Sequence, residues 1–214
     1  MSAERPFAFG GINHLALVCS DMARTVDFYT RVLGMPLVKT VELPAGMGQH
    51  FFFDIGGGDS LAFFWFPEAP PAAPGVAAPA ARPDTGDLQS AVGSMNHVAF
   101  DVSADRIEEY RERLVAEGVA CSELVYHDDS EWTVSRAPHP GSFLGSVYFQ
   151  DPDGILLELA AWTRPLDEAD VRHAPAGAAV PAPAAPAPAA GACAARRWVA
   201  SDPPPPRPGP PCPG

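Results

Sequence analysis

The sequence predicts an α+β protein built from two copies of one βαβββ module. The phrase Asn-His followed by three apolar residues occurs at 13–17 and again at 96–100. Each copy is followed by a polar turn, a helical apolar pattern and a run of short strand-like segments with turn-length gaps. Helices between strands would also fit a doubly wound sheet, but three consecutive strands in each copy favour the α+β class.

The first module is expected to span residues 9–66. Residues 12–18 are apolar with a β-branched bias, which predicts an opening strand. Ser20 and Asp21 offer an N-cap, and Gly34 ends the helical pattern that follows. The apolar stripe of that helix consists of Val26, Phe28, Tyr29, Val32 and Leu33. Three strands separated by turn sequences are then expected at 37–43, 50–55 and 60–66.

The second module, residues 93–164, repeats this order. A strand at 95–102 precedes a helical pattern that ends at Gly118. The apolar stripe of this helix consists of Ile107, Tyr110, Leu114 and Val115. Further strands are expected at 120–126, 131–136, 146–149 and 155–161.

Two segments lie outside the modules. Residues 67–92 are rich in Pro and Ala and too long for a tight connection, so we expect a surface loop or partial lid there. Residues 174–214 are dominated by Ala, Pro and Gly and have little to bury. A disordered or polyproline-like tail is the expectation for them.

The composition of the chain indicates which classes of partner and which cellular location to expect. The chain has 26 acidic and 14 basic residues, a net charge of -12, which disfavours nucleic acid as a partner. Its four cysteines form no Cys-x-x-Cys pair, so neither a disulfide framework nor a thiolate zinc site is expected. The polar N-terminus and the short apolar runs predict a cytoplasmic protein without a membrane partner.

A metal site is predicted between the two modules. Aligning the closing strands on Gly58 and Gly154 places Ala62 where Glu158 stands. The modules then contribute His14, His97 and Glu158, and the last of these lies in an apolar run where an unpaired carboxylate is costly to bury. Each residue alone is more simply explained as a packed histidine or a surface carboxylate. Together they form the two-histidine, one-carboxylate set that leaves open positions on iron(II).

On these residues the sequence resembles the vicinal oxygen chelate superfamily, which includes glyoxalase I, methylmalonyl-CoA epimerase, bleomycin-resistance proteins and extradiol ring-cleavage dioxygenases. The resemblance covers residues 10–164. It implies paired βαβββ modules that form a cup-shaped mixed sheet around a divalent metal held by His14, His97 and Glu158. It also implies a small-molecule substrate and leaves a homodimer open, since relatives often pair modules across chains.

Within the superfamily the sequence is most similar to the extradiol dioxygenases. Their signature matches His139, the pair Val147-Tyr148, the turn at 151–154 and Glu158, although Ala137 departs from the residue types usual before the His. The resemblance implies that Tyr148 donates a hydrogen bond to a metal-bound substrate oxygen. It places His139 close to the metal.

The catalytic base of those enzymes has no counterpart here. Ring-cleaving relatives carry a His shortly before the second ligand strand, where residues 82–95 of this chain contain none. His50, His127 and Tyr126 are the candidates to replace it. For both histidines, an exposed loop or strand-end position is the simpler alternative.

Three functions remain open at this stage. An iron(II) dioxygenase is favoured, and the aromatic segments 51–53 and 63–66 favour an apolar or aromatic substrate. A glyoxalase- or epimerase-like enzyme would use a divalent metal as Lewis acid, but its relatives usually carry a fourth ligand where Ala62 lies. A metal-free binding protein is the third option. Manganese, zinc, nickel and cobalt are alternatives to iron.

Overall fold

The computed structural model describes residues 9–79 and 89–177 of the chain. The chain divides into two compact units, Met1–Val171 and Arg172–Gly214, and every described strand and helix belongs to the first. Within the described ranges, no helix has the length and apolar character needed to cross a membrane. The expected disorder of the tail falls almost wholly on residues outside the described ranges.

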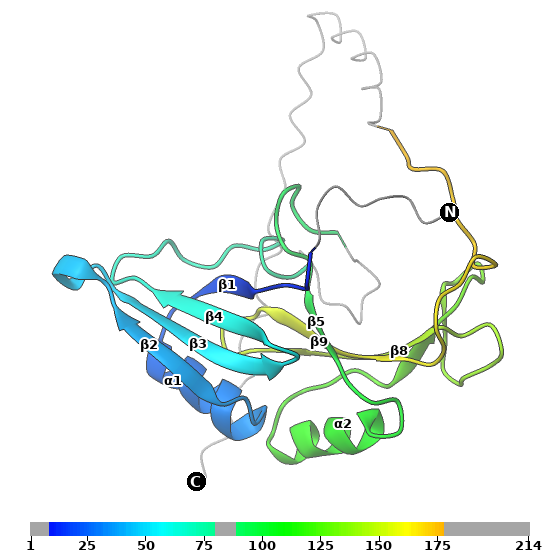
Figure 1. The fold of residues 1–214 in the computed structure, drawn as a ribbon, viewed down its shortest axis with the longest axis horizontal. Coiled ribbons are helices and arrows are strands. Elements are labelled where there is room, and N and C mark those ends of the chain that lie inside the picture. The colour runs from blue at the N-terminus through cyan, green and yellow to red at the C-terminus, as the bar shows by residue number, and fades with distance from the viewer. Residues whose placement is uncertain (1–8, 80–88, 178–214) are drawn as a thin grey trace, which may run out of the picture. The chain divides into compact units, whose positions relative to one another are not determined.

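The first module forms a four-stranded mixed sheet (Figure 1). Its elements are β1 (His14–Cys19), α1 (Met22–Asp27), a π-helical turn (Phe28–Val32), β2 (Leu37–Glu42), a 3-10 turn (Pro44–Gly46), β3 (Gln49–Gly56) and β4 (Asp59–Trp65). The strand order is β1-β4-β3-β2, with β1 parallel to β4 and the other neighbours antiparallel. The strand, helix and three-strand order predicted for this module is confirmed.

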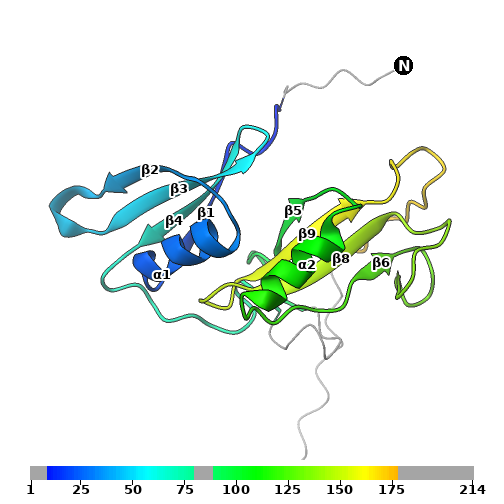
Figure 2. The same cartoon turned by 90° about the horizontal axis from the view of Figure 1, so that it is seen from below.

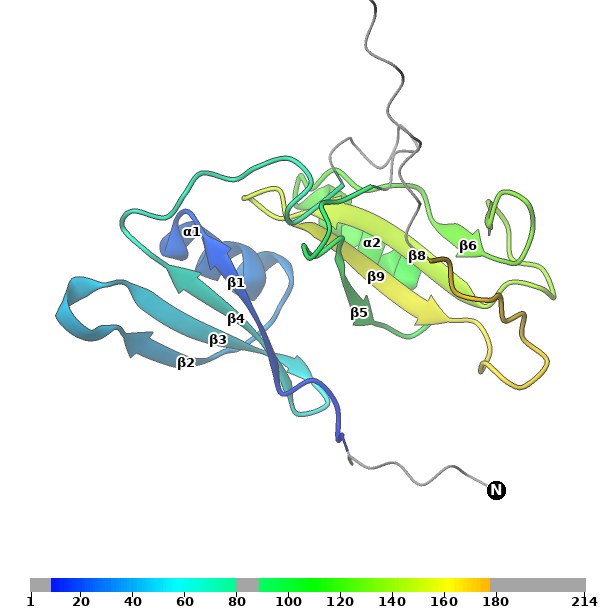
Figure 3. The same cartoon turned by 90° about the horizontal axis from the view of Figure 1, so that it is seen from above.

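The second module forms a separate five-stranded sheet, which has the plan of the first module plus one short edge strand, β7. Its elements are β5 (Val98–Asp101), α2 (Ile107–Ala116), β6 (Val125–His127), β7 (Val134–Ser135), β8 (Leu144–Gln150) and β9 (Leu156–Trp162). The order is β5-β9-β8-β6-β7, and β5 is parallel to β9 as β1 is to β4 (Figure 3). The predicted α+β class with two βαβββ modules is therefore confirmed.

Two predicted strands of the second module are shorter than expected. In the predicted strand 131–136, only Val134–Ser135 pairs, because Asp128 accepts the Ser130 N–H in a turn and Thr133 has a φ of 58°. In the predicted strand 120–126, only Val125–His127 forms a strand. An isolated bridge from Cys121 to Phe149 is what remains of its first half.

Each sheet has a helix on one face. Figure 2 shows α1 beside the first sheet and α2 lying along β8 and β9. Asp21 caps α1 as predicted, accepting a hydrogen bond from the Arg24 N–H at 3.0 Å. On β1, Leu15 and Leu17 pack into the core, while His14, Ala16 and Val18 are exposed. The face of the first sheet that carries His14 is therefore its open face.

Candidate metal centre

The strand register repeats around the two histidines. His14 lies two residues before Ala16, whose partner on β4 is Ala62. His97 lies two residues before Ala99, whose partner on β9 is Glu158. The two closing strands thus present Ala62 and Glu158 at equivalent positions, and each histidine stands at the entry of the neighbouring parallel strand.

His97 and Glu158 are in direct contact. His97 Nε2 lies 2.9 Å from Glu158 Oε2, and the two side chains are 35% and 3% exposed. The other carboxylate oxygen, Oε1, is buried and has no hydrogen-bond partner within the described residues. Burial is the largest influence on the pKa of Glu158 and raises it. Contacts with His97 and the nearby Ser146 outweigh burial, so the net pKa lies below the ordinary value.

No described contact joins His14 to this pair. Across residues 9–79 and 89–177, no three His, Cys, Asp or Glu side chains are gathered as a metal site. His14 is exposed, its Nδ1 lies 2.8 Å from Asn13 Oδ1, and its ring meets Phe52 edge-on. The fold brings together two of the three predicted ligands.

Tyr148 lies beside the His97–Glu158 pair. It is the direct partner of Glu158 across β8 and β9, and its ring is edge-on to that of His97 with centroids 5.9 Å apart. Its hydroxyl lies 3.2 Å from His127 Nε2. Burial, together with the charge of Glu158, raises the pKa of Tyr148 to about 12, so its hydroxyl remains protonated and can donate a hydrogen bond at neutral pH.

The three candidate bases lie in different surroundings. Alternation along β6 puts His127 on the face of Glu158 and Tyr126 on the opposite face. His50 lies on the face of the first sheet that carries His14, stacked on Phe64 with centroids 3.6 Å apart. Among these candidates, His127 is the one whose described contacts reach Tyr148.

His139 is held within its own loop. Its Nε2 donates to Asp128 Oδ2 at 2.8 Å, and its Nδ1 accepts the Gly141 N–H at 3.1 Å. Hydrogen bonds from Ser130 and then His139 lower the pKa of Asp128 to about 2. In the described part of the chain, the hydrogen bonds of His139 lead to this loop and not to His97, Tyr148 or Glu158.

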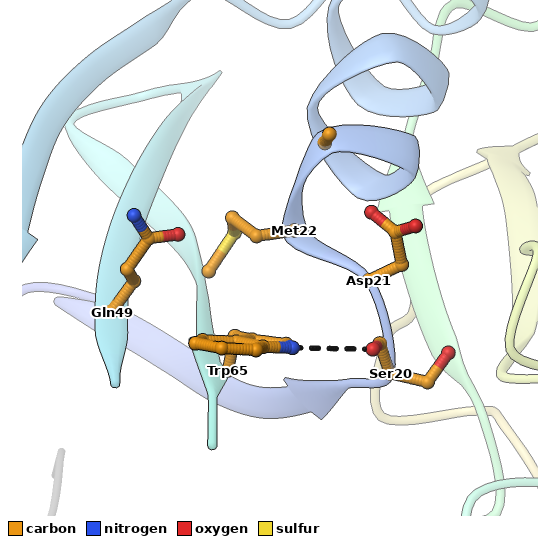
Figure 4. Close-up of a pocket in the computed structure, with 6 residues that line it drawn as sticks. Ser20, Asp21, Met22, Gln49 and Trp65 are labelled. Atoms are coloured by element: carbon orange, nitrogen blue, oxygen red, sulfur yellow. Dashed lines mark hydrogen bonds between the residues drawn. The ribbon is translucent and has the colours of Figure 1, made fainter. Parts of the chain in front are cut away.

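An open hollow of about 460 Å³ lies elsewhere on the first module. It is lined by Ser20, Asp21, Met22, Ala23, Gln49 and Trp65. Figure 4 shows the Trp65 indole, whose Nε1 donates to the Ser20 carbonyl at 3.2 Å. None of the predicted metal ligands lines this hollow, so it is distinct from the candidate centre.

Three residues that contact the predicted site histidines were not assigned a role from the sequence. Asn13 and Asn96 each contact the histidine that follows them, and Asp128 contacts His139. The repeated Asn-His phrase was the signal for the first two, and it marked the duplicated histidines without giving the asparagines a role of their own. Asp128 had no comparable signal, because its partner lies eleven residues away in the same loop.

Comparison with known proteins gives one family and several relatives. The family model of the Glyoxalase/Bleomycin resistance protein/Dioxygenase superfamily matches residues 11–159. Metallothiol transferase FosB of Shouchella clausii (strain KSM-K16) is 27% identical over 153 residues, which cover 72% of this chain and 81% of the relative.

Solved structures include shorter chains that this chain matches over nearly their whole length. SMU.1112c is 26% identical with a TM-score of 0.50, covering 70% of this chain and 97% of its own. A glyoxalase family protein from Enterococcus faecalis is 26% identical with a TM-score of 0.49, covering 71% and 98%. The fosfomycin resistance protein FosX of Listeria monocytogenes, solved with Mn(II) and sulfate, is 20% identical with a TM-score of 0.46, covering 73% and 95%.

Proposed function

Because the chain belongs to the glyoxalase/bleomycin resistance protein/dioxygenase superfamily, in which divalent metals are typical, we propose that it is a metal-dependent enzyme. His14, His97 and Glu158 are the proposed ligands, and the substrate is a small molecule that binds the metal through neighbouring oxygens. The observation that carries the proposal is Glu158, a buried carboxylate with His97 at one oxygen and no partner at the other.

The residues fit a divalent ion. A buried carboxylate oxygen without a hydrogen bond costs free energy unless something satisfies it, and a cation would do so. Both histidines have Nδ1 occupied by an asparagine oxygen, so Nε2 is the atom that each can offer. Two imidazoles and one carboxylate leave positions open for a substrate.

We further propose that the complete site is shared between two copies of the chain. His14 is exposed on the open face of its sheet, and the pair that lacks a third ligand lies in the other module. A homodimer in which His14 of one copy meets His97 and Glu158 of the second would complete two equivalent sites. This arrangement accounts for the absence of a three-ligand cluster within the described residues of one copy.

For the reaction, we propose dioxygenation of an aromatic or enediol-type substrate. A bound ferrous ion would supply the redox chemistry that makes dioxygen reactive. Tyr148, protonated because its pKa is about 12, donates a hydrogen bond to a substrate oxygen, and His127 holds the tyrosine hydroxyl in place by donating its Nε2–H to the hydroxyl oxygen. His139 acts indirectly, by fixing Asp128 at the end of the strand that carries His127.

The relative named metallothiol transferase supports a second candidate, a metal-dependent transfer reaction without oxygen. In such a reaction the bound metal would act only as a Lewis acid, without changing its oxidation state. Ala62 speaks against the glyoxalase- or epimerase-like form, because the equivalent position of the first module carries no carboxylate. A metal-free binding role would leave the buried Oε1 of Glu158 without an explanation.

Oxygen consumption separates these candidates. Protein reconstituted with iron(II) under argon is mixed with a panel of catechols and enediols, and oxygen uptake is compared with that of the His97→Ala variant. Uptake above the variant supports dioxygenation. No uptake, combined with metal-dependent consumption of a thiol and an electrophile under argon, would replace it with the transfer reaction.

Subunit mixing tests the shared site. His14→Ala and Glu158→Gln chains should each be inactive, but a mixed dimer of the proposed kind would contain one intact site. Unfolding and refolding the two chains together should restore about one quarter of the wild-type activity, since half of the dimers are mixed and each has one intact site of two. Activity that stays at the level of the separate variants would place all three ligands in one chain.

A further inference from the structure

We propose that the side-chain carbonyl oxygens of Asn13 and Asn96 fix the tautomer and the ring orientation of His14 and His97, so that each Nε2 is presented as a metal ligand. The inference rests on the proposed metal site and adds two positioning residues to it. It also gives a chemical reason for the repeated Asn-His phrase.

In the first module, the contact between asparagine and histidine lies at the exposed start of β1. Asn13 Oδ1 lies 2.8 Å from His14 Nδ1. An amide oxygen can only accept a hydrogen bond, so the proton of a neutral imidazole must sit on Nδ1. The lone pair is then on Nε2, which is the form that binds a metal through that atom.

The second module has the same contact, and its asparagine is itself held by a further hydrogen bond. Asn96 Oδ1 lies 2.7 Å from His97 Nδ1, while Asn96 Nδ2 donates to Ser90 Oγ at 2.8 Å. Because the amide nitrogen is committed to Ser90, the amide oxygen faces the imidazole. The opposite edge of the ring then points Nε2 at Glu158 Oε2, 2.9 Å away, where a bound metal ion would take the place of the Nε2 proton that this contact otherwise needs.

Backbone geometry explains why adjacent residues can touch here. Consecutive side chains within a strand point to opposite faces, which would separate Asn from His. Asn13 lies in a bend immediately before β1, and both Asn96 and His97 precede β5. Because each asparagine itself lies outside a strand, its side chain can fold against the ring that follows it.

A histidine with the opposite arrangement provides the contrast. The Nδ1 of His139 accepts the Gly141 N–H, and its Nε2 donates to Asp128, so the proton lies on Nε2. His139 therefore has no lone pair on the atom that His14 and His97 offer. His139 and His14 therefore carry the proton on different ring nitrogens, and a metal ion bound at Nε2 of His97 would leave the same Nδ1 proton there as in His14.

Partners of this kind matter for metal affinity. A hydrogen-bond acceptor at Nδ1 holds the imidazole in the ligating form, and its loss typically costs about 10- to 100-fold in affinity. Asn13→Ala should therefore weaken binding of cobalt(II) by about that factor. Asn13→Asp keeps an acceptor at the same place and should retain wild-type affinity. Asn96→Ala should show the same loss as Asn13→Ala.

The tautomer can be read without any metal. In metal-free protein labelled with ¹⁵N at histidine, at about pH 8 where imidazole is neutral, long-range ¹H–¹⁵N spectra identify the protonated ring nitrogen. His14, assigned with His14→Gln, should carry its proton on Nδ1 in the wild type and in Asn13→Asp. In Asn13→Ala the proton should move to Nε2, wholly or in part.

The outcomes are distinct. An Nε2-protonated His14 in the wild type, or an unchanged tautomer and unchanged cobalt(II) affinity in Asn13→Ala, overturns the inference. If the wild type binds no cobalt(II), the proposed function fails, while the spectra still decide whether Asn13 sets the tautomer. Asn13 is exposed, so Asn13→Ala should fold normally, and an unchanged thermal midpoint checks this.

Discussion

The two modules share a strand order, a parallel first and last strand and an Asn-His pair at the strand entry, yet they differ at one buried position. The first module has Ala62 and the second has Glu158, both nearly inaccessible to solvent. An alanine is covered by its neighbours at no electrostatic cost, whereas a buried carboxylate needs a partner. The duplication thus supplies two similar scaffolds, and a single difference makes one the source of the only carboxylate in the proposed ligand set.

Replacing Glu158 of the second module by alanine, the residue that the first module has at 62, should have the largest effect on activity. Glu158→Ala removes the carboxylate and should lower activity by several kcal/mol of transition-state stabilisation, on the order of 1000-fold, with loss of bound metal. Turnover and metal content measure this, and Glu158→Gln serves as the control of similar shape. Thermal stability of the metal-free protein should fall, because Glu158→Ala also removes the contact with His97. A metal-loaded, active Glu158→Ala protein would remove Glu158 from the site.

Making the first module resemble the second should damage the fold. Ala62 is fully buried and faces Phe52 across the strand pair, so Ala62→Glu must displace that ring and bury a charge. We expect a loss of about 3 kcal/mol or more in unfolding free energy, measured by denaturant titration. Ala62→Gln, which adds similar bulk without charge, separates the two contributions. Wild-type stability of Ala62→Glu would show that the two positions are not equivalent in packing.

The turns before the closing strands offer a third comparison. The first module has three glycines at 56–58, while the second has Asp151, whose Oδ1 accepts the Asp153 and Ile155 N–H groups, both at 2.8 Å. Its Oδ2 accepts the Tyr29 hydroxyl at 3.2 Å. Burial, as the largest influence, raises the pKa of Asp151 to about 6.

This pKa predicts a pH-dependent stability. The folded state holds the proton more tightly than the unfolded state, so the contribution of Asp151 is most favourable below about pH 4 and is lost as the pH rises through about 6. The loss is on the order of 3 kcal/mol. Asp151→Asn keeps an acceptor for both N–H groups and should be the more stable protein at pH 7. The difference between variant and wild type, followed by urea unfolding from pH 4 to 7.5, should grow with pH; a constant difference would contradict the assignment.

The smallest expected effect concerns Tyr148, the cross-strand partner of Glu158. In the first module the corresponding partner of Ala62 is Phe52, which has no hydroxyl. Tyr148→Phe removes a hydrogen bond to a charged substrate oxygen, worth about 1.5 to 3 kcal/mol, and should lower kcat by roughly 10- to 100-fold. Steady-state kinetics with the active substrate measure it, and metal content should be unchanged. His127→Gln should have an effect in the same direction, and the double variant should lose little beyond Tyr148→Phe alone. Full additivity would show that the two residues act separately.

The fold was predictable because its signals are local. Period-two strands, a capped helix ending at Gly34 and a repeated phrase at 13–17 and 96–100 were sufficient for two βαβββ modules. The predicted strand 131–136 was wrong over most of its length because side-chain hydrogen bonding by Asp128 and the left-handed backbone of Thr133 replaced pairing. Such turn chemistry competes with strand propensity and leaves only a weak mark in the sequence.

The site was predictable to the extent that it depends on strand register. The alignment of Ala62 with Glu158 follows from the repeat, and the register reproduces it. The hydrogen bond between His139 and Asp128 could not be predicted in the same way. It depends on the conformation of a loop, and loop conformations leave no periodic pattern of apolar residues in the sequence. That the described residues form no three-ligand cluster also had no sequence signal.

Metal stoichiometry tests the central claim most directly. Wild-type protein and the His14→Ala, His97→Ala and Glu158→Ala variants are purified without oxygen, reconstituted with iron(II), desalted and assayed by elemental analysis. The account predicts one iron per chain in the wild type and loss of iron in each of the three variants, with folding preserved by circular dichroism. A wild type that retains no metal, or variants that all retain it, would contradict a centre built from His14, His97 and Glu158.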